Sequence, residues 1–276
     1  MTEIDAHCHF WSLARGDYGW LEGEGGPLAP IRRDFAPSDM PGTAPVIAVS
    51  AAPSSAETDY LLRLKHPRLA GVVGWVDLAA PSTCGQISDL AINPRFRGIR
   101  PMLQDIPETD WLLTAPRADT LATMARMNLT FDALVTPRHL GVLATFAAQN
   151  PDLAIVIDHA AKPRLAVGGE DEEWLAGMAA LAADPRIHCK LSGLLTEVSP
   201  AQLADPLAVL GPVVGRLLDW FGPERLIWGS DWPVLNLAGD YALWRSLTDQ
   251  LLAELTDDER AAIMGGNAAR FYGISL

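Results

Sequence analysis

Residues 4–11 read IDAHCHFW, an apolar run that carries Asp5, His7 and His9 at every second position. Side chains two positions apart in a strand share a face, so we expect these three to point one way and Cys8 the other. Two histidines one residue apart are notable in a chain that has six. The same pattern, an apolar run that ends in polar groups, recurs along the sequence and predicts the fold.

Further apolar, β-branched runs follow at fairly even intervals, as is typical of parallel strands buried on both faces. The predicted strands are residues 3–9, 46–50, 71–78, 97–101, 129–134, 154–159, 187–192 and 225–231. Apolar residues at helical spacing lie between most of them, at 54–67, 115–128, 137–151, 170–185, 205–223 and 240–273. The first crossover, residues 12–45, is rich in Gly, Pro and charge and predicts a long loop.

This strand–helix alternation predicts an α/β protein with a (β/α)8-type (TIM) barrel, formed as a single domain by residues 1–276. No linker or change of composition divides the chain. A doubly wound sheet is the alternative. It is disfavoured because no glycine-rich GxGxxG loop follows the first strand.

Charge and composition exclude several classes of partner. The net charge of −13 argues against nucleic acid, since phosphate backbones repel an acidic protein. No apolar stretch is long enough to cross a bilayer, so we expect no membrane partner. The three widely spaced cysteines and the lack of a signal-peptide pattern predict a cytoplasmic protein.

Polar side chains end several of the predicted strands, and the C-terminal ends of barrel strands carry the chemistry. His7 and His9 end the first strand, Arg100 the fourth, His159 the sixth and Asp231 the eighth. Three imidazoles and a carboxylate can bind one divalent metal and leave a position for water. Without metal, the same groups could hold a water by hydrogen bonds, with Asp231 as base and Arg100 stabilising an oxyanion.

Other residues are candidates for the substrate pocket. Trp232, beside Asp231, offers a flat apolar surface that suits a sugar face. Lys190 ends the seventh strand and either contacts substrate or pairs with Asp231 or Asp132. Lys162 and Trp20 are further candidates. For Lys162 the alternative interpretation is a solvated side chain on a loop, without contact to the substrate.

Three polar residues receive no functional role from their positions. Asp158 precedes His159, so we expect it to face outward and cap the following turn. His66 and His139 lie in helical segments near prolines, and we expect both at the surface.

The motifs IDAHCHFW, RGIRPMLQD, IVIDHAAKP, CKLSGL and LIWGSDWPV, in this order, resemble those of the amidohydrolase-related lactonases. The resemblance implies a distorted TIM barrel that opens sugar-acid lactones such as L-fuconolactone and L-rhamnonolactone. It implies an active centre of His7, His9, His159 and Asp231, with Arg100 on the substrate. Two positions depart from the family pattern: Cys8 stands in place of a glutamine, and Pro101 in place of a larger polar residue.

The resemblance implies one divalent metal, zinc or manganese, or none, because a bridging lysine of the binuclear kind is not evident. We therefore predict a lactonase of carbohydrate catabolism that acts on a small-molecule lactone, as a monomer or homodimer. A dicarboxylate lactone hydrolase of aromatic degradation, of the pyrone dicarboxylate or muconolactone type, is the first alternative. It would need convergent arginines, and only Arg164 could join Arg100. A decarboxylase of the same superfamily and a non-catalytic binding barrel are further alternatives.

Overall fold

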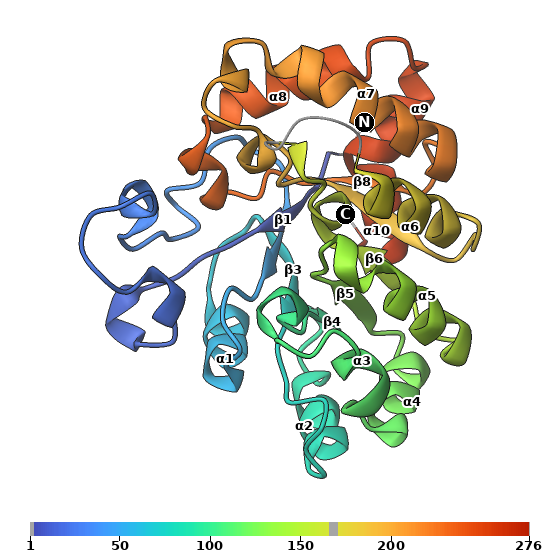
Figure 1. The fold of residues 1–276 in the computed structure, drawn as a ribbon. Coiled ribbons are helices and arrows are strands. Elements are labelled where there is room, and N and C mark those ends of the chain that lie inside the picture. The colour runs from blue at the N-terminus through green and yellow to red at the C-terminus, as the bar shows by residue number, and fades with distance from the viewer. Residues whose placement is uncertain (1–2, 166–170, 276) are drawn as a thin grey trace.

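The computed structural model describes residues 3–165 and 171–275. Its centre is a sheet of eight parallel strands, hydrogen-bonded in chain order (Figure 1). The strands are β1 Asp5–Cys8, β2 Val46–Val49, β3 Leu69–Gly74, β4 Phe96–Ile99, β5 Thr130–Ala133, β6 Ile155–Ile157, β7 His188–Leu191 and β8 Leu226–Trp228. All eight overlap the predicted strands. The third ends earlier than expected, because the N–H of Trp75 donates to the hydroxyl of Thr58 and leaves the ladder.

Backbone hydrogen bonds just beyond the strand ends close the barrel between β1 and β8. The N–H of Asp231 donates to the carbonyl of His7 at 2.8 Å, and the N–H of His9 donates to the carbonyl of Trp232 at 2.7 Å. The sheet is therefore a nearly closed TIM-type barrel, and the doubly wound alternative is wrong. The seam also places Asp231 directly beside the two histidines.

A bulge between Asp5 and Cys8 interrupts the two-residue alternation of β1. The carboxylate of Asp5 accepts the backbone N–H of Ser230 at 2.9 Å, whereas Ala6 packs inside the barrel with Val156. The expectation that Asp5 shares a face with the two histidines is therefore wrong. Its carboxylate instead stabilises the seam.

Helices surround the barrel (Figure 1), and each predicted helical segment contains at least one of them. Residue 170, the first of the segment predicted at 170–185, lies outside the described residues. Two short helices, α2 Thr83–Leu90 and α3 Trp111–Thr114, were not predicted, because segments of eight and four residues are too short to show a clear helical period. Among the described residues, no helix is both long and apolar enough to cross a membrane. The helices are α1 Ser55–Arg63, α2 Thr83–Leu90, α3 Trp111–Thr114, α4 Ala118–Arg126, α5 Leu140–Gln149, α6 Glu172–Ala182, α7 Pro206–Phe221, α8 Tyr241–Leu251, α9 Asp257–Ala261 and α10 Asn267–Phe271.

The long first crossover contains three 3-10 turns and no α-helix, so the prediction of a loop at 12–45 is confirmed. It leaves β1 and lies to one side of the barrel (Figure 1). A backbone pairing between Trp11 and Phe35 ties its two arms together. The Trp11 ring packs edge-to-face with the rings of Phe35 and Trp20. The loop is thus ordered by aromatic packing.

The C-terminal segment packs into the barrel at the end away from the histidines. Tyr272 and Ile274 join strand residues such as Ile4 and Ile47 in one buried cluster. The hydroxyl of Tyr272 donates to Asp132 of β5 at 2.7 Å. One end of the barrel is therefore filled by side chains, and the polar strand ends are left at the other.

Gly98 of β4 lies where a side chain has no room, because a Cβ there would be 2.0 Å from Thr130 Oγ1 on β5. We predict that Gly98→Ala lowers the free energy of unfolding by about 1–3 kcal/mol, the usual cost of overpacking. In the control Gly85→Ala, on the exposed side of α2, the new Cβ meets nothing within 4 Å. That change should raise the free energy of unfolding by about 0.5–1 kcal/mol, since alanine favours helix. Urea unfolding of both variants, followed by circular dichroism, measures the two effects; equal shifts would contradict this packing.

Candidate active site

Four of the predicted site residues meet in one buried cluster at the C-terminal end of the barrel. His7 and His9 come from β1 and its end, His159 follows β6, and Asp231 follows β8. The Oδ1 atom of Asp231 lies 3.2 Å from His9 Nε2 and 3.8 Å from the Nε2 atoms of both His7 and His159. One carboxylate oxygen therefore faces three imidazole rings.

Unusual backbone conformations aim two of these side chains. His159 and Asp231 have φ values of 52° and 59°, in the left-handed region. Residues 159–162 are all left-handed, at a cost of about 1–2 kcal/mol per residue. The indole N–H of Trp174 donates to the carbonyl of Ala160 at 2.6 Å and anchors this turn. Strain of this kind persists where the surroundings enforce it and is concentrated at functional sites.

The hydrogen bonds of His9 show that the cluster suits a cation. Its Nδ1 lies 2.8 Å from the carbonyl of Val49, which can only accept, so Nδ1 carries the proton. In a neutral ring the Nε2 lone pair then faces the Asp231 carboxylate oxygen 3.2 Å away. Two atoms with lone pairs this close need a proton or a metal ion between them.

The donor set is the kind that binds zinc. Ligand atoms of His7, His9 and Asp231 all lie within 4.8 Å of one another, and His159 lies beside His7, with ring centroids 4.4 Å apart. Imidazole nitrogens and a carboxylate oxygen are ordinary zinc ligands. The hydroxyl of Ser192 contacts His159 Nδ1 at 2.9 Å and orients that ring. The cluster can hold one divalent metal.

Burial sets the charge states of the cluster. It lowers the pKa of His159 to about 4, so this imidazole is neutral at neutral pH. Burial would raise the pKa of Asp231, but His159, His9 and His7 hold it well below its ordinary value. A neutral His159 beside an ionised Asp231 is the combination that both metal binding and base catalysis require.

Arg100, at the end of β4, lies beside the cluster. Its guanidinium donates to the carbonyl of Ser50, and Nη1 lies 3.5 Å from His7 Nε2 and 3.7 Å from an Asp158 oxygen. The side chain lines a cavity of about 310 Å³, together with His9, His159 and Asp231. Arg100 therefore both pairs with a buried neighbour and reaches the space where a substrate would lie.

Residues from several loops form the rest of this cavity. Trp20 and Leu28 come from the first crossover, and the indole N–H of Trp20 donates to the carbonyl of Ala51 at 2.9 Å. Gln104, Asp105 and Lys162 add polar groups. Hydrogen-bonding groups beside an indole ring suit a small polyhydroxylated molecule.

Two expected pocket residues lie elsewhere. Trp232 is buried, with its ring packed against Phe35 and Phe10, because the long crossover covers it. Lys190 is fully buried inside the barrel and forms an ion pair with Asp132 at 2.6 Å. Neither lines the cavity. The alternative expectation, that Lys190 pairs with Asp132, is confirmed.

Two of the residues expected at the surface are buried. The left-handed turn after β6 brings Asp158 and His159 into the barrel together, so the expectation that Asp158 faces outward is wrong. Its carboxylate lies 2.9 Å from Lys190 Nζ. His139 is also buried, because its ring folds back to accept the N–H of Thr136 at 3.1 Å.

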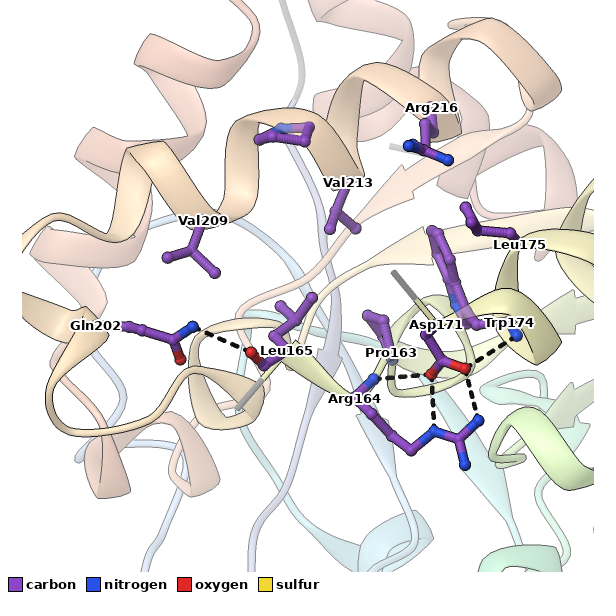
Figure 2. Close-up of a pocket in the computed structure, with 11 residues that line it drawn as sticks. Pro163, Arg164, Leu165, Asp171, Trp174, Leu175, Gln202, Val209, Val213 and Arg216 are labelled. Atoms are coloured by element: carbon purple, nitrogen blue, oxygen red, sulfur yellow. Dashed lines mark hydrogen bonds and ion pairs between the residues drawn. The ribbon is translucent and has the colours of Figure 1, made fainter. Parts of the chain in front are cut away.

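Arg164 lies outside the active-site cavity. Figure 2 shows it in a separate pocket, with its guanidinium bonded to Asp171. Its side chain is 53% exposed and also pairs with Glu173 at 2.9 Å. Arg164 therefore cannot serve as the second arginine that a dicarboxylate substrate would need.

Sequence reasoning missed the role of Glu57. This buried carboxylate accepts the backbone N–H groups of Ala51 and Ala52 at 2.8–3.0 Å. It thereby holds the loop whose carbonyls bind Arg100 and Trp20. In the sequence, Glu57 stands three residues after the helix cap Ser54, where a glutamate is ordinarily explained by capping alone.

Comparisons with known proteins show what the whole chain is similar to. A protein named L-fucono-1,5-lactonase from Burkholderia ambifaria is 45% identical, over 98% of this chain and 95% of that protein. A second L-fucono-1,5-lactonase, from Burkholderia multivorans, is 36% identical, over 98% of this chain and 96% of that protein. A crystal structure of an amidohydrolase from Burkholderia multivorans with bound zinc has a TM-score of 0.88 at 33% identity, and the alignment covers both chains fully.

A family model described as amidohydrolase matches residues 4–274. The match spans all eight strands and every residue of the His/Asp cluster. The chain therefore belongs to the amidohydrolase family.

Proposed function

We propose that this protein is a lactonase that opens a sugar-acid lactone to the hydroxy acid. The observation that carries the proposal is the ionised Asp231 among three histidines, beside Arg100, at a cavity of about 310 Å³. The two L-fucono-1,5-lactonases to which the chain is similar support the same substrate class.

In the proposed mechanism Asp231 takes a proton from water as the water oxygen bonds to the lactone carbonyl carbon. The guanidinium of Arg100 stabilises the oxyanion that develops on the carbonyl oxygen. The ring C–O bond then breaks, and the proton passes from Asp231 to the leaving alkoxide. His9 and His159 flank the carboxylate, with their Nε2 atoms 3.2 and 3.8 Å from Oδ1. A divalent ion bound by His7, His9 and Asp231, with His159 adjacent, would supply Lewis acidity to this reaction.

A neutral sugar lactone fits the cavity better than a dicarboxylate. Among the described residues that line it, Arg100 is the one arginine, and Lys162 the one lysine. A dianion would call for several converging cations. We further propose that Trp20 and Lys162 contact the sugar. Action in carbohydrate catabolism, a cytoplasmic location and a monomeric or dimeric state stay predictions.

The substrate class is tested by proton release from a panel of lactones with zinc or manganese present. We predict turnover of L-fucono-1,5-lactone or a related aldonolactone, and much slower turnover of 2-pyrone-4,6-dicarboxylate. Preference for the dicarboxylate would favour the aromatic-degradation alternative. Release of carbon dioxide from a carboxylate substrate, without lactone hydrolysis, would favour a decarboxylase.

We predict that Asp231→Asn lowers kcat on the aldonolactone by about 10²–10⁴-fold, the usual contribution of a positioned base. The amide has nearly the same shape but cannot take the proton from water. KM should change little, because the cavity wall is preserved. Circular dichroism controls for folding, and a variant with near wild-type kcat would exclude Asp231 as the base.

A matched pair of variants distinguishes the role of Arg100 from that of Arg164. We predict that Arg100→Lys lowers kcat/KM for the aldonolactone by about 10²-fold, as expected for loss of an oxyanion donor. Lysine keeps the charge but lacks the planar fork that reaches Ser50 and the cavity together. Arg164→Lys, in the separate pocket, should leave kcat/KM unchanged. Equal losses in both variants would contradict the assignment.

A further inference from the structure

Two polar side chains that line the active-site cavity have no role in the proposed reaction. Gln104 and Asp105 belong to a 3-10 turn, Leu103–Asp105, which follows β4. Neither side chain forms a hydrogen bond or an ion pair with another residue that the structure describes. The amide and the carboxylate are therefore available to a ligand in the cavity.

The depth of these two groups suits the part of a lactone that does not react. Arg100 and Asp231, which act on the carbonyl in the proposed mechanism, are buried, whereas Gln104 is half-buried and Asp105 is exposed. The cavity thus runs from the reacting groups at its floor to the turn after β4 at its mouth. A lactone whose carbonyl lies at Arg100 extends its other ring carbons, with their hydroxyl groups, toward this mouth.

The turn that carries the two side chains is held in place by its neighbours. The guanidinium of Arg138 donates to the carbonyls of Ile106 at 2.7 Å and Pro107 at 3.0 Å. The backbone N–H of Gln104 donates to the carbonyl of Leu134, which follows β5, at 3.0 Å. A backbone that is already ordered loses less conformational entropy when a ligand binds, so these groups are preorganised.

A carboxylate and an amide are well suited to sugar hydroxyl groups. The two oxygens of Asp105 can accept from two hydroxyls at once, and the amide of Gln104 can both donate and accept. A carboxylate at the mouth also repels a substrate that carries carboxylates of its own, because like charges side by side are unfavourable. The pair therefore favours a neutral polyhydroxylated lactone over a dicarboxylate.

We propose that Gln104 and Asp105 are specificity-determining residues that bind the hydroxyl groups of a neutral sugar lactone. This inference rests on the proposed lactonase function and adds the residues that recognise the sugar. The reaction itself stays with Asp231 and Arg100. Loss of either specificity residue should therefore raise KM and leave kcat unchanged, as expected when an interaction is equally strong in the ground state and the transition state.

The first test is steady-state hydrolysis by the variants Gln104→Leu and Asp105→Ala. We expect each to raise KM for L-fucono-1,5-lactone by about 3–10-fold, the usual worth of one hydrogen bond, with kcat unchanged. On δ-valerolactone, a lactone of the same ring size without hydroxyl groups, kcat/KM should equal that of the wild type. Equal losses on both lactones would overturn the proposal, because the residues would then act through the fold. An unchanged KM for the sugar lactone would overturn it as well.

Glu108→Ala is the matched control for the loss of charge in Asp105→Ala. Glu108 lies three residues further along the same loop, is exposed and does not line the cavity. We expect wild-type kinetics on both lactones. A rise in KM as large as that of Asp105→Ala would overturn the proposal, because net charge rather than contact would then set the affinity.

A binding measurement distinguishes failure of this inference from failure of the lactonase assignment. The 1,5-lactam that corresponds to the sugar lactone keeps the hydroxyl groups and resists hydrolysis, since an amide replaces the ester. In isothermal titration calorimetry we expect Gln104→Leu and Asp105→Ala to bind it about 3–10-fold more weakly than the wild type and Glu108→Ala do.

The lactam comparison decides alone if the wild type hydrolyses no lactone, in which case the lactonase assignment fails by itself. It also decides if δ-valerolactone is turned over too slowly to measure. Equal lactam affinity in all four proteins, or no binding by the wild type, would overturn the inference. Circular dichroism confirms that each variant is folded.

Discussion

Two backbone hydrogen bonds at the seam between β1 and the segment after β8 determine the geometry of the active centre. They join Asp231 to His7 and His9 to Trp232, residues more than 200 positions apart in the chain. Because main-chain atoms make the connection, the carboxylate lies beside the imidazoles whichever rotamers the side chains adopt. The left-handed conformation of Asp231 then directs Oδ1 toward all three rings.

Charge pairing makes it possible to bury this cluster. Lys190 and Arg100 supply two positive charges, against the carboxylates of Asp132, Asp158 and Asp231. A buried ion pair is stable only when its geometry offsets the loss of hydration, and contacts of 2.6 and 2.9 Å at Lys190 meet that condition. One negative charge remains, on the side of Asp231, where the lone pairs of His9 and the carboxylate face each other. That excess is what a proton or a divalent cation would neutralise.

The cavity depends on loops that barrel strands hold at their ends. Glu57 fixes the short loop after β2 through three N–H···O contacts, and that loop in turn binds Arg100 and Trp20. The long first crossover brings Trp20 to the wall and covers Trp232. The reacting groups therefore stand on rigid elements, whereas the groups suited to selecting a substrate stand on loops, which vary more readily.

The sequence by itself determined the eight strands, the barrel and the cluster of His7, His9, Arg100, His159 and Asp231. These follow from local patterns: apolar runs buried on both faces, and polar residues where each run ends. Only the tertiary structure decided the directions of Asp5 and Asp158, because a bulge and a left-handed turn break the two-residue alternation on which the prediction relied. It also decided the burial of Trp232 and the partners of Lys190. The burial of Trp232 and the ion pairs of Lys190 depend on contacts with segments that are distant in the chain. The spacing of apolar residues within one segment cannot predict such contacts.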